Sequence, residues 1–125
     1  MPRGVFLGRR VEKPWGYELI WGHTQNYVGK ILHVEAGHAL SLQYHQVKDE
    51  TMYLLSGEIA IELGDSEDEL QTHVLQPGQS VHLPAGRRHR LTARTTSDVL
   101  EVSTPEIDDV VRLEDRYGRR GTTEA

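Results

Sequence analysis

Residues able to hold a metal ion gather in the middle of the sequence. Gln43 and His45 are two positions apart, and Glu50 follows five positions later. Residues i and i+2 of a β-strand face the same side of a sheet, so a strand here would point Gln43 and His45 together, about 7 Å apart. A turn over 46–49 would bring Glu50 back to face them. An imidazole, a carboxylate and an amide oxygen that converge in this way suit a divalent metal ion.

A histidine in the second half of the chain is placed to join them. The stretch 78–89 predicts a strand, a Pro-Ala-Gly turn and a second strand that opens with His89. Taken singly, His45 and His89 suit hydrogen-bonded interior positions as well as metal ligands, and Glu50 suits the protein surface. The prediction of a metal site therefore depends on the spacing of both stretches together.

Both stretches resemble the motifs of the cupin superfamily. The first motif sets a glycine, His-X-His, a glutamate and a glycine at fixed spacing, and residues 37–57 match it except at its first histidine. The second motif, a glycine followed by Pro-X-Gly and a histidine, is matched at Gly78, Pro84, Gly86 and His89. The resemblance implies an all-β fold, the double-stranded β-helix or jelly-roll barrel.

The exception, Gln43, points to one branch of that superfamily. Gln43 followed by His45 and Glu50 resembles the mannose-6-phosphate isomerase type II cupins. Lys13–Glu18 is similar to the entry motif of those domains and Glu114–Arg119 to their closing motif. The resemblance implies interconversion of aldose and ketose sugar phosphates, mannose 6-phosphate and fructose 6-phosphate being the family's pair. The 125 residues do not include the nucleotidyltransferase domain of the bifunctional members.

The same resemblance implies one divalent metal ion, which could be zinc, manganese, iron, nickel or cobalt. Its ligands would be Gln43, His45, Glu50 and His89, and it would polarise the carbonyl and hydroxyl oxygens of the sugar. Gln43 is the weakest of these ligands because its amide oxygen is neutral; its other role would be to hydrogen-bond a metal-bound water. The sequence assigns no catalytic base, and Glu50 is a poor candidate because it is committed to the metal.

Two other functions fit the same residues. Without Gln43, the ligands are two histidines and a carboxylate, the set that non-haem iron oxygenases use. A non-catalytic cupin that binds a metal and a sugar is the second alternative, because a fold does not fix a function.

Cationic side chains near the motifs are candidates for binding the phosphate of a sugar phosphate. Arg87 and Arg88 lie in the predicted turn at the barrel mouth, where a guanidinium could hold a phosphate through two hydrogen bonds. A solvated turn explains both residues equally well. The segments that resemble the family's ends supply Lys13, Arg116 and Arg119, which would close over the mouth.

The composition restricts the partners. A net charge of −5 over 125 residues argues against nucleic acid and against an anionic membrane surface. The partner that the resemblance implies is a small sugar or sugar phosphate. The chain has no cysteine, so disulfides and zinc–thiolate sites are excluded. It also has no long apolar run and no signal-peptide core, so we expect a cytoplasmic protein.

Short strands must position these residues. Alternating and aromatic runs predict about nine strands, the pattern of a barrel formed by a single domain over residues 1–125. The predicted strands are 17–21, 27–34, 39–44, 51–55, 58–63, 72–75, 80–83, 89–93 and 99–103. Strand register decides whether His33 and His82 face the barrel interior, since a shift of one residue reverses every side chain.

One short helix is predicted after Thr104. Thr104 suits the N-cap, Pro105 suits the first helical position, and acidic residues follow in the first turn. The apolar stripe of this helix would consist of Ile107, Val110 and Val111.

The two ends of the chain are predicted to lie outside the barrel. Residues 1–10 suit an extended N-terminal arm, and 120–125 a flexible tail. The arm offers Val5-Phe6-Leu7 as a strand for exchange with a second copy. Because dimerisation also covers open sheet edges, we expect a homodimer.

Overall fold

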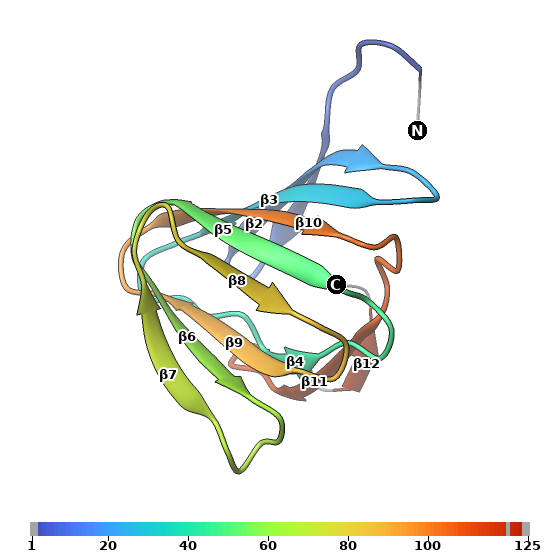
Figure 1. Cartoon of the computed structure of the whole chain (residues 1–125). Coiled ribbons are helices and arrows are strands. Elements are labelled where there is room, and N and C mark those ends of the chain that lie inside the picture. The colour runs from blue at the N-terminus through green and yellow to red at the C-terminus, as the bar shows by residue number, and fades with distance from the viewer. Residues whose placement is uncertain (1–2, 120, 124–125) are drawn as a thin grey trace.

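The computed structural model describes residues 3–119 and 121–123, and within them it contains strands and no helix. These residues form two six-stranded antiparallel sheets that face each other (Figure 1). The first sheet contains, in spatial order, β1 (Arg9–Lys13), β2 (Gly16–His23), β3 (Val28–Val34), β10 (Ser97–Ser103), β5 (Glu50–Ser56) and β8 (Ser80–Leu83). The second contains β12 (Gly121–Thr123), β11 (Val110–Glu114), β4 (Leu42–Tyr44), β9 (Arg88–Ala93), β6 (Ile59–Gly64) and β7 (Gln71–Leu75). This arrangement confirms the predicted all-β jelly-roll barrel.

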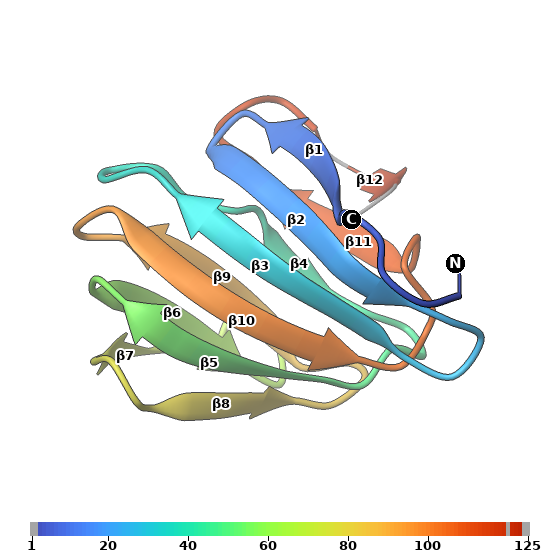
Figure 2. The same ribbon diagram turned by 90° about the horizontal axis from the view of Figure 1, so that it is seen from above.

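Distant parts of the chain lie side by side in both sheets. Seen from above, β10 lies between β3 and β5 in the first sheet (Figure 2). In the second sheet β9 lies between β4 and β6. The two halves of the sequence are therefore interleaved, which allows residues from both to meet in the interior.

The interior has an apolar half and a charged half. Leu54, Ile59, Ile61, Leu91 and Val99 belong to a core cluster in which each of them is at most 2% exposed. The charged half contains buried side chains of both signs, from β2, β3, β5, β10 and the loop after β4. These are Glu18, Lys30, Lys48, Glu50 and Glu101, and Arg112 of β11 is buried with them.

Strand alternation explains how charged residues come to lie inside. In β3, Val28, Leu32 and Val34 are buried, and Lys30 shares their face of the strand and is also buried. His33 occupies the opposite face, where its Nδ1 lies 2.7 Å from Asp98. A lysine at an inward position is therefore enclosed by the same pattern that encloses the valines.

The predicted C-terminal helix is wrong. Turns precede β11, and within it Val111 pairs with Tyr44 of β4 and Arg112 with Gln43. β-Branched valines favour extended backbone, and the open edge of β4 offers hydrogen bonds that an isolated short helix lacks. Pairing within the sheet has outweighed the local helix-start signals.

Both ends of the chain differ in part from expectation. Arg9 and Arg10, assigned to the arm, belong to β1, while residues 3–8 form no strand and lead away from the sheets (Figure 1). Gly121–Thr123, within the expected flexible tail, pair with β11. Residues 1–2, 120 and 124–125 of these two segments lie outside the described residues. No helix capable of crossing a membrane occurs in the part of the chain that the structure describes.

Candidate metal centre

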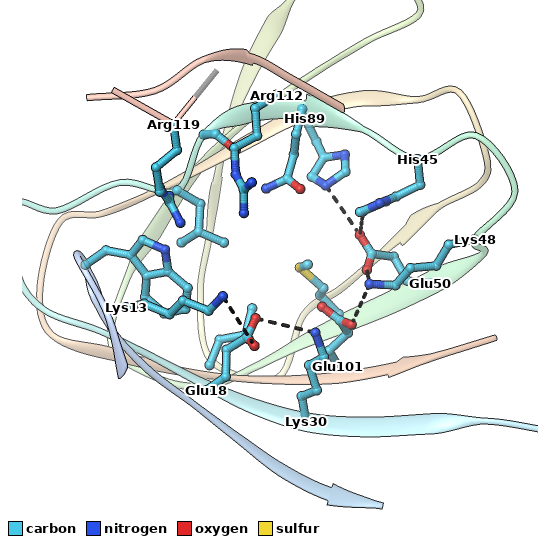
Figure 3. Close-up of a pocket in the computed structure, with 16 residues that line it drawn as sticks. Lys13, Glu18, Lys30, His45, Lys48, Glu50, His89, Glu101, Arg112 and Arg119 are labelled. Carbon is cyan, nitrogen blue, oxygen red and sulfur yellow. Dashed lines mark hydrogen bonds and ion pairs between the residues drawn. The ribbon is translucent and has the colours of Figure 1, made fainter. Parts of the chain in front are cut away.

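Three buried side chains converge in the charged half of the interior. His45 directly follows β4, Glu50 opens β5 and His89 is the second residue of β9. Glu50 Oε1 lies 3.1 Å from His45 Nε2 and 3.3 Å from His89 Nε2, and the three ligating atoms lie within 4.8 Å of one another (Figure 3). The fold thus brings together two histidines and a glutamate that the sequence separates.

Hydrogen bonds behind the two imidazoles determine which nitrogen faces Glu50. His45 Nδ1 lies against the backbone carbonyl of Asp109, and His89 Nδ1 lies 3.0 Å from the carbonyl of Arg87. A carbonyl oxygen only accepts, so each Nδ1 carries a proton and donates it, and Nε2 is the nitrogen of each ring that can coordinate a metal. Both Nε2 atoms face the carboxylate of Glu50: without an ion they hydrogen-bond it, and with an ion in place they are free to coordinate.

This set of donor atoms fits a divalent metal ion. A cation placed among two imidazole nitrogens and a carboxylate oxygen is attracted to all three. Ligands bound at about 2.1 Å from one ion, at roughly 90–109° to each other, are about 3.0–3.4 Å apart. The separations of 3.1 and 3.3 Å between Glu50 Oε1 and the two Nε2 atoms lie in that range, which overlaps that of hydrogen bonds, and the three atoms lie within 4.8 Å of one another. A metal-binding histidine also commonly donates its other ring N–H to a carbonyl, as both do here.

The charge state of Glu50 agrees with that role. Burial by itself raises the pKa of Glu50, but the neighbouring His45, His89 and Lys48 outweigh burial and hold this pKa well below its usual range. The carboxylate is therefore ionised, as a metal ligand must be.

Two loops hold the histidines in place. The carboxylate of Asp109 accepts hydrogen bonds from the backbone N–H groups of residues 46, 47 and 48, between 2.7 and 3.0 Å long. Gly86 donates its N–H to the carbonyl of His45 at 2.7 Å, and its φ of 87° suits a residue without Cβ. The Pro-X-Gly turn of the second motif is thereby bonded to the histidine of the first.

Gln43, the fourth predicted ligand, lies beside His89. The two residues are directly opposite each other on β4 and β9, and Arg112 of β11 is opposite Gln43 on its other side. Gln43 is half-buried and lines the same cavity as the three converging residues. A row of Arg112, Gln43 and His89 therefore crosses the second sheet, with neighbouring strands about 4.8 Å apart.

Lys48 and Glu101 extend the ionic network beyond the metal ligands. Lys48 Nζ is 3.1 Å from Glu50 Oε2 and 3.1 Å from Glu101 Oε2, and all three side chains are buried. Burial lowers the pKa of Lys48, but the charges of Glu101 and Glu50 outweigh burial and raise this pKa above its usual value. Burial, followed by the charge of Glu50, raises the pKa of Glu101. Lys48 thus stays charged and holds the second oxygen of Glu50.

The converging residues open onto a cavity with room of about 30 Å³ for water-sized groups, within about 410 Å³ of empty space that includes its open mouth. Five of its lining side chains are cationic and three are carboxylates, although the chain as a whole has a net charge of −5. The charged lining residues are Lys13, Glu18, Lys30, Lys48, Glu50, Glu101, Arg112 and Arg119. The cavity is therefore a locally positive region within an acidic protein.

Of the predicted phosphate-binding residues, Lys13 lines this cavity and the two turn arginines do not. Arg87 pairs with Asp65 at 2.8 Å on the surface. Arg88 stacks its guanidinium over the ring of Tyr44, 3.9 Å from the centroid. Of the closing-motif arginines, Arg119 lines the cavity.

The remaining predicted residues point elsewhere. The Nη1 of Arg116 binds the carbonyl of Gly37 at 2.8 Å. His82 is exposed and pairs with Asp49 at 2.6 Å. His33 also faces outward, as described above, so neither histidine lines the cavity.

Sequence reasoning missed several cavity residues. Lys30, Glu18 and Glu101 each stand two positions from a buried apolar residue of the same strand. A charged residue in phase with an inward apolar pattern is the signal that could have found them, because such residues are seldom fully buried without a partner. Asp109 carried no such signal, since its role depends on the loop after β4.

The chain is similar to parts of larger carbohydrate-biosynthesis proteins. It is 34% identical over 117 residues to the xanthan biosynthesis protein XanB of Xanthomonas campestris pv. campestris (strain B100), which covers 89% of this chain and 24% of that protein. It is 33% identical over 119 residues to the mannose-1-phosphate guanylyltransferase ManC of Salmonella typhimurium, a match that covers 90% of this chain and 24% of that protein. The chain thus spans about a quarter of the length of these relatives.

A solved structure and a family model agree on the fold. The capsular polysaccharide assembling protein CapF of Staphylococcus aureus superposes with a TM-score of 0.77 at 17% identity, over 90% of this chain and 33% of that one. The model of the cupin domain matches residues 30–104, which include His45, Glu50 and His89. The chain therefore belongs to the cupin domain family.

Proposed function

We propose that this cupin is a metal-dependent isomerase that interconverts aldose and ketose sugar phosphates, with mannose 6-phosphate and fructose 6-phosphate as the expected pair. The observation that carries the proposal is the locally positive cavity beside His45, Glu50 and His89. A cavity of this charge in an acidic chain favours an anionic ligand, and a metal beside it favours a ligand that also offers oxygen atoms.

The chain's own residues have separate roles in this proposal. His45, Glu50 and His89 hold one divalent ion, and Gln43 adds an amide oxygen beside His89. When bound, such an ion acts as a Lewis acid toward carbonyl and hydroxyl oxygens. The backbone carbonyls of Asp109 and Arg87 keep the histidine protons on Nδ1, so that both Nε2 atoms stay available.

The names of the relatives support a carbohydrate substrate. One is a xanthan biosynthesis protein and another acts on mannose 1-phosphate by its name. The isomerase activity itself is proposed from the resemblance of Gln43, His45 and Glu50 to the isomerase-type cupins. The likeness covers about a quarter of each relative, so we propose for this chain only the activity that its own cavity favours.

The test is metal analysis of the purified protein followed by an isomerase assay across hexose and pentose phosphates. We expect about one divalent ion per chain and turnover of a phosphorylated aldose that stops after chelation. Bound iron with oxygen consumption would instead indicate an oxygenase. Sugar-dependent thermal stabilisation without turnover would indicate a binding protein.

A further inference from the structure

Cations gather at the part of the cavity away from His45 and Glu50. Figure 3 shows Lys13, Arg112 and Arg119 pointing into the cavity from the side opposite these two residues. Lys13 ends β1, Arg112 lies in β11, and Arg119 belongs to the turn that follows β11. Elements from both ends of the chain therefore supply this cluster.

Arg119 is held in one orientation by a buried carboxylate. Its Nε and Nη2 lie 3.1 and 3.0 Å from the two carboxylate oxygens of Asp115, whose side chain is fully buried. The backbone N–H of Arg119 donates to the same carboxylate at 2.8 Å. Its Nη1 is not engaged by Asp115. A guanidinium fixed in this way is preorganised to bind a planar or tetrahedral anion.

The cations of this cluster repel one another, and Glu18, whose Oε2 lies 4.0 Å from Lys13 Nζ, offsets part of this repulsion. Burial, followed by the charge of Arg119, lowers the pKa of Arg112. Burial also lowers the pKa of Lys13, to which Arg112, Arg119 and Lys30 add while Glu18 opposes them. A bound anion would relieve this repulsion.

Ser41 provides an independent sign of a ligand in the same cavity. Its hydroxyl is buried, lines the cavity and has no hydrogen-bond partner among the described residues. A buried hydroxyl without a partner is costly, and a polar ligand in the cavity would satisfy it.

We infer that Lys13, Arg112 and Arg119 form the subsite for the phosphate group of the substrate, at the opposite side of the cavity from His45 and Glu50. The inference rests on the proposed function and adds the orientation of the substrate in the cavity. Arg112 and His89 are two strands apart in the row through Gln43, roughly 10 Å between their backbones. A sugar phosphate spans that distance with its phosphate at Arg112 and its carbonyl end at the metal ligands.

Inorganic phosphate is the direct probe of this subsite. Titration calorimetry on the chelator-treated protein should show binding that Arg112→Gln weakens about ten- to hundredfold, the usual effect of losing a charge-assisted contact. Arg94→Gln, which removes an exposed arginine elsewhere, is the matched control and should bind as the wild type does. If Arg112→Gln fails to fold, Lys13→Gln should show the same direction of change.

Two results would overturn the assignment. One is wild-type phosphate affinity in folded Arg112→Gln or Lys13→Gln. The other is loss of phosphate binding in Arg87→Gln, which would show that the turn arginines Arg87 and Arg88 bind the phosphate.

Kinetics separate this inference from the proposed isomerase. In an active, metal-loaded enzyme, Arg112→Gln should raise the KM for the phosphorylated hexose about ten- to hundredfold with unchanged metal content. An unchanged KM would refute the phosphate subsite without contradicting the proposed isomerase activity. If the protein has no isomerase activity but binds phosphate in a way that depends on Arg112, the isomerase proposal is refuted and the phosphate subsite is supported.

Discussion

At the scale of single residues, the direction of the histidine protons is the main feature of the metal centre. The carbonyls of Asp109 and Arg87 accept from the two Nδ1 atoms, and Glu50 occupies the position between the two Nε2 atoms. Each histidine is therefore specialised for coordination before any ion binds. Loss of either ring should affect metal binding more than it affects folding.

The first prediction concerns these ligands. His45→Ala or His89→Ala should abolish binding of the divalent ion, because each variant leaves only one histidine nitrogen, one carboxylate and the neutral amide oxygen of Gln43 at the centre. Glu50→Gln should weaken binding less, because an amide oxygen can still coordinate. Elemental analysis and calorimetric titration measure both effects. Full metal occupancy in both histidine variants would show that the ion binds elsewhere.

The second prediction concerns Lys48. It is the cation shared by the buried carboxylates of Glu50 and Glu101. Lys48→Met should reduce the free energy of unfolding by about 3–5 kcal/mol, because it leaves two buried charges without their partner. Urea denaturation of the metal-free protein measures the loss.

A double variant provides the control for Lys48. Adding Glu101→Gln to Lys48→Met removes one of the stranded charges, so the double variant should be more stable than Lys48→Met alone. If the loss of unfolding free energy in the double variant equals the sum of the losses in Lys48→Met and Glu101→Gln, Lys48 and Glu101 are not coupled.

At the scale of elements, the sequence predicted most strands because their side chains alternate. β3 illustrates this, with Val28, Leu32 and Val34 on its inner face. β1 was missed, because Arg9–Lys13 is a polar edge strand with little alternation. Spacing within the two motifs sufficed to predict that His45, Glu50 and His89 meet.

Elements whose structure depends on distant partners could not be predicted in this way. Residues 104–111 carry good local signals for a helix, yet Val111 and Arg112 pair with β4, and Asp109 binds the loop after it. The cationic cavity lining was missed for a related reason. Arg112 faces inward only in the register in which β11 pairs with β4, and a shift of one residue would expose it.

The third prediction concerns the turn after β11. Burial raises the pKa of Asp115, but hydrogen bonds from Arg119 and from the N–H of Tyr117 outweigh burial and lower this pKa. The folded state therefore binds this proton less tightly than the unfolded state, whose pKa is about 3.9. The stabilisation is complete above that value and is lost as the pH falls through the folded pKa.

Asp115→Asn tests this directly. Wild type should be the more stable protein near pH 7, and the difference in unfolding free energy should shrink below about pH 4. Thermal or urea unfolding at several pH values measures it. A difference that stays constant down to pH 2 would show that Asp115 does not act through its charge.

At the scale of the whole molecule, the outer face of the first sheet carries a row of apolar residues. Leu19, Ile31, Leu100 and Tyr53 are directly opposite one another across β2, β3, β10 and β5. Exposed apolar residues near this row are Trp21 (47%), Leu55 (52%) and Val102 (54%). A contiguous apolar face of this kind is more typical of an interface than of a solvated surface.

The last prediction is that this face is covered in a homodimer, to which the N-terminal arm contributes. Val5 and Leu7 are almost fully exposed in the single chain, and the arm leads away from its own sheets, so a partner can bind it (Figure 1). Val102→Lys should favour the monomer, because it places a charge at the centre of the interface, and deletion of 1–10 should weaken the dimer. Val74→Lys, on β7 of the other sheet, is the matched control and should leave the dimer unchanged. Light scattering at micromolar concentration distinguishes the states, and a monomeric wild type would refute the prediction.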